Sequence, residues 1–236
     1  MRLILIHGAG LGKWAWDRVL PDLEFPALAV ELPRRGDTTQ VLSSMGLEDY
    51  AQSVVEQIGG PQDERIMLVG HSVGGEIALR VASRLGTRVA GIALVSAVVP
   101  PPGKSMLSLQ PWLQRLFMRA VFAFGSPVPP EKVIRASGCN DLDEATCRML
   151  VEKYSPESPR LFLDPVAWTP AELPPCLYVK TLLDRTVLPP IQDLMIARAK
   201  PRRVETLGSG HLPMLAKPRE LAALLNGFAH SLMTAK

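Results

Sequence analysis

The chain has 236 residues, of which 47% are hydrophobic and 21% are charged, so it can bury a substantial core. Its formal net charge is only +3 and its lysines and arginines are scattered, which gives no sign of a nucleic-acid-binding surface. The three cysteines, Cys139, Cys147 and Cys176, form no CxxC pair and lack zinc-ligand spacing, so we expect no disulfide framework, no metal site and a reducing compartment. No apolar run is long enough for a signal peptide or a membrane span, so we expect a cytoplasmic protein with no membrane partner.

Short apolar runs alternate with amphipathic segments along the chain. The runs lack the alternation of a half-exposed strand and cover residues 3–7, 27–32, 66–70, 89–99 and 176–183, with a weaker one at 202–208. Between them, Glu48–Ile58, Glu76–Leu85 and Pro218–Leu232 carry apolar residues at helical spacing. This order predicts an α/β fold, with a mostly parallel sheet flanked by helices in a single domain of residues 1–236.

The first apolar run leads into a glycine-rich loop, HGAGLGK, at residues 7–13. A dinucleotide-binding loop needs a third glycine where this chain has Lys13, and a phosphate-binding loop needs a hydroxyl where it has Trp14. Both nucleotide interpretations are therefore weak, and the sequence predicts no cofactor.

The stretch IMLVGHSVGGEIAL, residues 66–79, contains the pattern G-x-S-x-G between an apolar run and a helical pattern. In that context a tight strand-to-helix turn exposes the serine hydroxyl, and the N-terminus of the following helix stabilises negative charge on a reacting oxygen. Five-residue patterns of this kind also occur by chance. The strand-turn-helix setting favours Ser72 as a nucleophile.

A proline-rich segment interrupts the alternation from Pro100 to about Pro175. It contains two helix-like pieces, Leu109–Phe124 and Asp143–Tyr154, and no convincing strand. We predict an insertion over approximately 100–175 that lies at the strand ends, where ligands bind in open α/β folds.

A nucleophilic serine needs a base, and the base needs an acid that orients it. Three of the four histidines are poor candidates for the base, because His7 lies in the first loop, His71 is next to the serine and His230 is near the end of a helix. The remaining histidine, His211, lies in a Gly-Ser-Gly loop after a strand and is the favoured base. Asp184 ends the run 176–183 and is the favoured acid, although a carboxylate there could also cap a helix. The other candidates lie in the insertion or in the next helical stretch: Asp141, Asp143, Asp164 and Asp193.

Four segments together carry a family resemblance: HGAGLGKWAW, GHSVGGEIA, LLDRTVLP and GSGHLPMLAKPRELAALL. They resemble the α/β-hydrolase superfamily and, more narrowly, its small plant-type methylesterase and hydroxynitrile lyase branch. The resemblance covers both ends of the chain and fades in the insertion, which would be the family's variable lid. It implies that Ser72 attacks a carbonyl carbon, His211 relays the proton and Asp184 holds the imidazole. It also implies an oxyanion hole made by the backbone N–H groups of Ala9 and Val73.

Two positions separate the esterases from the lyases in this branch. The lyases carry a threonine after the first-loop histidine and a lysine after the catalytic histidine, where this chain has Gly8 and Leu212. An apolar leucine offers no charge for a cyanide leaving group, so hydrolysis is favoured. The plant esterases usually have a cysteine-histidine pair where this chain has Gly10 and Leu11, which leaves the substrate range open.

The predicted helix Leu109–Phe124 has an apolar stripe that either lines the substrate pocket or packs on the body of the domain. As pocket residues we expect Leu11, Trp112, Leu116, Phe117 and Leu212. The predicted function is hydrolysis of a small carboxylic ester with an apolar part, through an acyl-enzyme; a thioester or lactone is equally compatible. The alternatives are a lyase or cyclase that uses the same residues and a ligand-binding protein without turnover. The oligomeric state is not predicted.

Overall fold

The computed structural model describes residues 1–33, 44–109, 112–113, 115–116, 119, 128–169 and 173–234. Six strands form one parallel sheet in the order β2-β1-β3-β4-β5-β6. The strands are β1 (Arg2–Ile6), β2 (Ala27–Ala29), β3 (Ile66–His71), β4 (Val89–Val95), β5 (Cys176–Thr181) and β6 (Arg203–Leu207). The described α-helices are α2 (Leu47–Ile58), α3 (Gly74–Leu85), α5 (Glu131–Gly138), α6 (Glu144–Glu152), α7 (Pro159–Leu163), α8 (Pro189–Ala199), α9 (Pro213–Ala216) and α10 (Pro218–Thr234).

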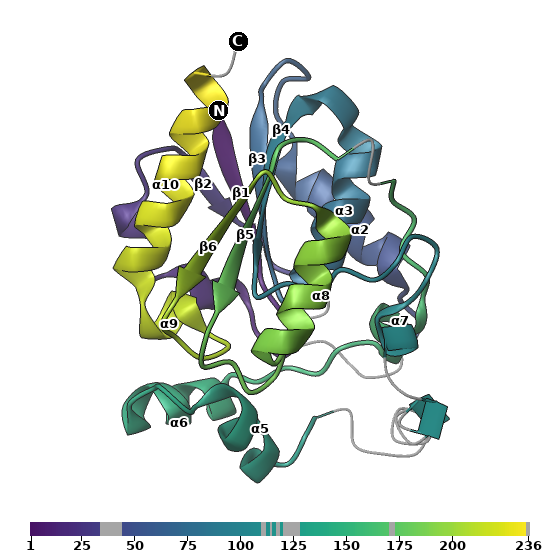
Figure 1. Ribbon diagram of the computed structural model, residues 1–236, viewed down its shortest axis with the longest axis vertical. Helices are drawn as coiled ribbons and strands as arrows, with labels where there is room; N and C mark the ends of the chain where they lie inside the picture. The colour runs from purple at the N-terminus through teal and green to yellow at the C-terminus, as the bar shows by residue number, and fades with distance from the viewer. Residues whose placement is uncertain are drawn as a thin grey trace.

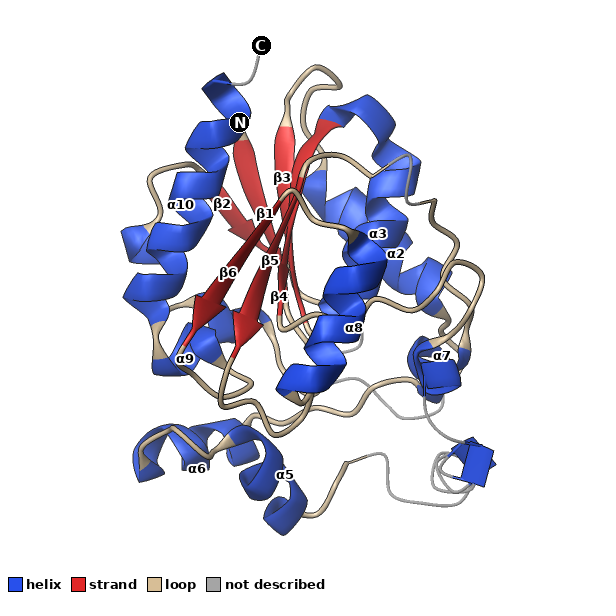
Figure 2. Cartoon of the chain, in the orientation of Figure 1, coloured by secondary structure: helices blue, strands red, loops and turns tan. Residues whose placement is uncertain are grey.

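Helices cover both faces of the sheet, with α2, α3 and α8 on one face and α9 and α10 on the other (Figure 1; Figure 2). This arrangement explains why the strands lack polar alternation. In β1, Ile4 and Ile6 belong to the core cluster under α2 and α3, while Leu3 and Leu5 belong to the cluster under α10. The predicted α/β fold class and the three predicted flanking helices are confirmed.

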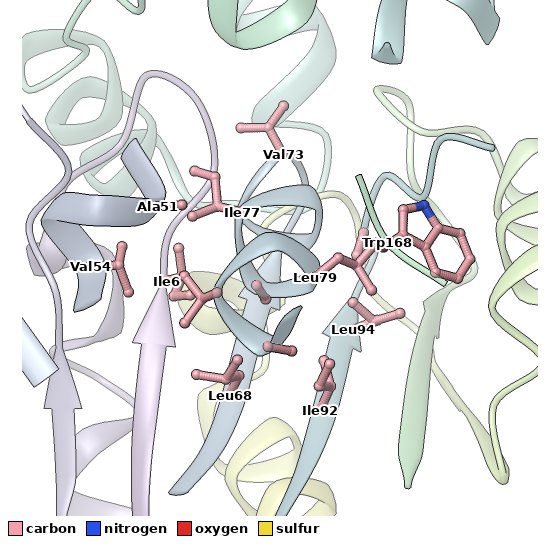
Figure 3. Close-up of a cluster of buried hydrophobic side chains, with 14 of the residues drawn as sticks. Ile6, Ala51, Val54, Leu68, Val73, Ile77, Leu79, Ile92, Leu94 and Trp168 are labelled. Atoms are coloured by element: carbon pink, nitrogen blue, oxygen red, sulfur yellow. The ribbon is translucent and has the colours of Figure 1, made fainter. Parts of the chain in front are cut away.

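The core between α2, α3 and the sheet is built from aliphatic side chains. Figure 3 shows Ala51 and Val54 of α2 beside Ile6 of β1 and Ile77 of α3. All four are fully buried. Since burying such a side chain contributes about 1.5–3 kcal/mol for the larger ones, this layer firmly holds α3 and the turn that precedes it.

The segment between β4 and β5 lies outside the sheet. Its helices α5 and α6 lie beyond the carboxyl ends of β5 and β6 (Figure 1). The predicted piece Asp143–Tyr154 corresponds to α6, whereas α5 and α7 were not predicted. Most of the predicted helix Leu109–Phe124, including Phe117, lies outside the described residues.

The cysteines contradict one sequence expectation. Cys139, which follows α5, and Cys147 in α6 form a disulfide, with their Cα atoms 5.6 Å apart. The turn between the two helices brings the pair together, and spacing alone did not reveal this. Cys176 is free, and burial in β5 raises the pKa of its thiol to about 12. The expectation of no disulfide is therefore wrong, the cysteines no longer favour a reducing compartment, and the cytoplasmic location stays a prediction.

None of the described helices is long and apolar enough to cross a membrane.

Candidate active site

Ser72 occupies a sharp turn between β3 and α3. Its backbone φ is +54°, a left-handed conformation that is costly for a residue with a side chain. The turn is held because the Ser72 N–H donates to the Val95 carbonyl (3.1 Å). It also requires close backbone contact: a Cβ on Gly70 would lie 2.5 Å from the Gly74 oxygen, and one on Gly74 would lie 2.6 Å from the Ile6 oxygen. The two glycines of the motif therefore allow the strained serine conformation.

Three side chains predicted from the sequence are brought into hydrogen-bond contact at the carboxyl ends of the strands. The Ser72 hydroxyl lies 3.1 Å from His211 Nε2, and His211 Nδ1 lies 2.8 Å from Asp184 Oδ2. All three residues are buried, with between 2% and 7% of their surface exposed. If Nδ1–H donates to the carboxylate, Nε2 is free to accept the serine proton, which is the tautomer that a general base needs.

The Asp184 carboxylate is surrounded by donors. Its Oδ1 accepts the backbone N–H groups of Thr186 (2.7 Å) and Val187 (2.8 Å), and its Oδ2 accepts the hydroxyls of Thr181 (2.9 Å) and Ser96. Burial alone would raise the pKa of Asp184. The hydrogen bond and charge of His211, followed by the bonds from Ser96 and Thr186, outweigh burial and lower the pKa to about 2. The carboxylate is therefore ionised beside the imidazole.

Ser96 was not predicted as a site residue. It follows β4 with a φ of +45°, and its hydroxyl lies 3.2 Å from His211 Nδ1 as well as beside Asp184. It contacts the imidazole on the side facing the acid, opposite the nitrogen that faces Ser72. Ser96 therefore braces the pair of His211 and Asp184, from a position immediately after the end of β4 at Val95.

The other candidate acids have different partners. Asp141 accepts the Gly210 N–H, Asp143 accepts the Thr146 N–H at the start of α6, Asp164 accepts the Leu47 N–H and Asp193 pairs with Lys180. In the described part of the chain, Asp184 is the carboxylate whose contact with His211 is observed. His230 is exposed and pairs with Glu24, far from this site in the fold.

The first loop presents a backbone amide to the same site. The Gly8 carbonyl accepts hydrogen bonds from His7 Nδ1 (2.8 Å) and from the Leu11 N–H (3.3 Å), while His7 Nε2 accepts the Leu32 N–H (3.2 Å). The Gly8 carbonyl and the Ala9 N–H belong to one peptide plane and point in opposite directions. His7 therefore fixes the direction of the Ala9 amide.

Two amide groups beside Ser72 have no acceptor in the part of the chain that the structure describes. Among the hydrogen bonds of the described residues, none is donated by the Ala9 or the Val73 N–H. Both residues line the same cavity as Ser72 and His211, and Val73 immediately precedes α3. Free amides at a helix N-terminus are suited to bind an oxyanion. Both amides predicted for the oxyanion hole, those of Ala9 and Val73, thus lie at the cavity, and their role in binding an oxyanion stays a prediction.

His71 supports the base from the other side. Its Nε2 donates to the His211 carbonyl (2.7 Å), and its ring lies 4.8 Å from the His211 ring. Burial, followed by the charge of His211, lowers the pKa of His71 to about 3, so it stays neutral. The sequence could not assign a role to His7 or His71. In the structure, His7 holds the Gly8 carbonyl through Nδ1, and His71 holds the His211 carbonyl through Nε2.

A cavity of about 200 Å³ opens above Ser72. Leu11 and Leu212 line it, as predicted, whereas Trp112 and Leu116 do not. Those two side chains are 61% and 57% exposed in the part of the chain that the structure describes, and their assignment to the pocket stays a prediction. Residues from α5, α6 and α7 line the cavity. Among the described residues, the lining is Ala9, Leu11, Ser72, Val73, Met106, Pro129, Val133, Ile134, Ser137, Gly138, Leu150, Tyr154, Phe162, Thr186, His211 and Leu212.

The parallel sheet, the nucleophile turn and the hydrogen-bonded serine, histidine and aspartate define the hydrolase class of α/β folds. A family model described as "Alpha/beta hydrolase family" matches residues 3–224, so the chain belongs to this family.

Its relatives include methylesterases. Methylesterase 17 of Arabidopsis thaliana is 28% identical over 94% of this chain and 89% of the relative, and Methylesterase 3 of the same plant is 26% identical over 94% of each. The crystal structure of an Arabidopsis methylesterase superposes with a TM-score of 0.78 at 19% identity, covering 98% of this chain and 99% of that one. The resemblance to the methylesterase branch is confirmed.

Proposed function

We propose that this protein hydrolyses carboxylic esters through an acyl-enzyme formed on Ser72. One observation carries the proposal: the Ser72 hydroxyl lies 3.1 Å from His211 Nε2, inside a cavity that also exposes the unpaired amides of Ala9 and Val73. A nucleophile, a base with its acid and two oxyanion donors therefore surround one point. The names of the curated relatives, which are methylesterases, agree with this reaction class.

The chemistry follows from the positions of these groups. As Ser72 Oγ attacks the carbonyl carbon, His211 Nε2 takes the hydroxyl proton, and the ionised Asp184 stabilises the imidazolium that forms. The carbonyl oxygen becomes an oxyanion and accepts the Ala9 and Val73 amides. Collapse of the adduct passes the proton to the leaving alcohol, and water then releases the acid by the same steps in reverse.

The cavity favours a neutral substrate with an apolar part. Its described lining has mostly aliphatic and aromatic side chains and includes no Asp, Glu, Lys or Arg. A charged acyl group would lose its hydration without gaining a partner. Small apolar carboxylic esters are therefore the substrate class that we propose, with Leu11 and Leu212 contacting the apolar part.

Two positions favour hydrolysis over cyanohydrin cleavage. Leu212 lines the cavity where the lyases carry a lysine, so the side chain at this position offers no cation for cyanide. At Gly8, a Cβ would lie 2.7 Å from His71 Nδ1 and 2.9 Å from Ser72 Cβ, which leaves no space for the lyase threonine.

The direct test measures hydrolysis of p-nitrophenyl esters from acetate to octanoate. We expect Ser72→Ala and His211→Ala each to lower kcat by at least roughly 10⁴-fold, and Asp184→Asn to produce a loss of similar order because the imidazole takes the wrong tautomer. His230→Ala, which removes an exposed histidine, is the matched control and should keep wild-type turnover.

A second readout does not depend on the choice of ester. A fluorophosphonate should label wild-type protein at Ser72 and leave Ser72→Ala unlabelled. A wild-type protein that neither turns over any ester of the series nor reacts with the probe would contradict the proposal.

A further inference from the structure

The short segment that follows α6 holds the first loop at Gly10. The Ser155 N–H donates to the Gly10 carbonyl (3.0 Å), and the Gly10 N–H donates to Glu157 Oε1 (3.2 Å). The Tyr154 ring lies over the Gly10 α-carbon, where an added Cβ would collide with it. Both hydrogen-bonding groups of Gly10 are thus taken by residues from the insertion, far away in the sequence.

Glu157 is itself held by the body of the domain. The hydroxyl of Tyr50, a fully buried residue of α2, donates to Glu157 Oε2 (2.9 Å) and accepts the Ser158 N–H (3.1 Å). Only 8% of the Glu157 surface is exposed. One carboxylate therefore links α2 to the first loop through its two oxygens, with a buried hydroxyl fixing its orientation.

This link adjoins the amide that faces Ser72. The peptide groups on both sides of Ala9 are held by hydrogen bonds. His7 donates to the Gly8 carbonyl before it, and Glu157 accepts the Gly10 N–H after it. Glu157 is not among the described residues that line the cavity, so any effect on the reaction must pass through the loop. A displacement of about 1 Å in a hydrogen-bond donor is enough to lower turnover by roughly a hundredfold.

We infer that Glu157 is a positioning residue of the oxyanion hole: held by Tyr50, it accepts the Gly10 amide and thereby keeps the Ala9 N–H directed at the substrate oxygen. This inference rests on the proposed ester hydrolysis. It makes the insertion a structural part of the oxyanion hole as well as a cover for the substrate.

The test compares Glu157→Ala, Glu157→Gln and Tyr50→Phe with wild type. Glu157→Ala should lower kcat by about tenfold to a hundredfold, because the Ala9 donor is loosened rather than removed, with KM changed by less than about threefold. In Glu157→Gln the amide oxygen can still accept the Gly10 N–H while its NH₂ donates to Tyr50, so most of the turnover should return. The kcat of Tyr50→Phe should lie between those of Glu157→Ala and Glu157→Gln.

A pair of inhibitors separates positioning from general structural damage. An aryl trifluoromethyl ketone forms an anionic adduct with the serine, whereas the matching methyl ketone binds without that anion. Glu157→Ala should weaken the trifluoromethyl ketone by the same factor as kcat and leave the affinity for the methyl ketone unchanged. Glu152→Ala, which removes an exposed carboxylate of α6, is the matched control and should change neither.

The outcomes are distinguishable. Unchanged kcat in the Glu157 variants, or equal weakening of both ketones together with a raised KM, overturns the inference. If Glu157→Ala does not fold, the inference is tested by the ratio of the affinities for the two ketones in Glu157→Gln and Tyr50→Phe. A wild-type protein without turnover, binding both ketones equally, refutes the proposed function itself and the inference with it.

Discussion

At Gly8, the close approach of the nucleophile turn leaves no space for a side chain. A Cβ there would lie 2.7 Å from His71 Nδ1 and 2.9 Å from Ser72 Cβ. We expect Gly8→Ala to push the turn and the first loop apart and to lower kcat by roughly tenfold or more, because it moves the Ala9 donor relative to Ser72. The measurement is kcat on p-nitrophenyl butyrate.

Gly208 provides the matched control for this substitution. It follows β6 near the His211 loop, and a Cβ there would meet nothing within 4 Å. Gly208→Ala should therefore keep turnover and stability close to wild type. Equal activity of the two variants would show that the first loop accommodates a side chain, and would remove the steric argument against a lyase threonine.

Some residues of the site could be selected from the sequence, and others could not. Ser72, Asp184 and His211 each follow an apolar run, and the carboxyl ends of parallel strands meet at one edge, so local context was enough to select them. Ser96 and Glu157 carry no such local signal. Their roles depend on partners brought close only by the folded chain, Asp184 for the first and Gly10 for the second.

At the scale of elements, the buried strands and the presence of the insertion were predictable, but two of the insertion's helices, α5 and α7, were not. A strand covered on both faces shows as an apolar run, whereas α5 and α7 are short and half exposed, and α7 begins with Pro159 after a Ser158 cap. For the apolar stripe with Trp112 and Leu116, the sequence left open whether it lines the pocket or packs on the domain, because periodicity identifies a face without showing what that face contacts.

The disulfide between Cys139 and Cys147 connects α5 to α6. Ile134 of α5 and Leu150 of α6 both line the cavity, so the link holds two of its walls together. Reduction should lower the free energy of unfolding by about 2–3 kcal/mol for a loop of this length. It should also raise KM for apolar esters. Thermal unfolding and ester kinetics with and without a reductant measure both effects.

The control for this prediction is a chain that lacks the link. The double variant Cys139→Ser with Cys147→Ser should resemble the reduced wild type and should not respond to the reductant. Cys176 is buried in β5 with its pKa raised to about 12, so its thiol should not contribute. A wild-type melting temperature that is insensitive to reductant would argue against a stabilising disulfide.

For the whole molecule, a buried carboxyl on α3 sets how stability depends on pH. Glu76 is fully buried, and neither of its side-chain oxygens has a hydrogen-bond partner in the described structure. Burial, followed by the charge of nearby Asp164, raises the pKa of Glu76 well above its usual value of 4.5. The folded chain therefore keeps a proton that the unfolded chain releases above pH 4.5.

The sign of the resulting effect is fixed by linkage. Between pH 4.5 and the folded pKa, the folded state binds one more proton than the unfolded state, so Glu76 makes stability fall by about 1.4 kcal/mol per pH unit. Glu76→Gln removes this pH dependence, so the variant should gain stability relative to wild type as pH rises from 4.5 toward the folded pKa of Glu76, and the difference should vanish near pH 4. Urea unfolding across this pH range measures the difference in stability.

Glu48→Gln is the control with the opposite sign, because a hydrogen bond from Arg80 lowers the pKa of Glu48 and its ionised form stabilises the fold. A Glu76→Gln curve parallel to wild type at every pH would show that folding does not raise the pKa of Glu76.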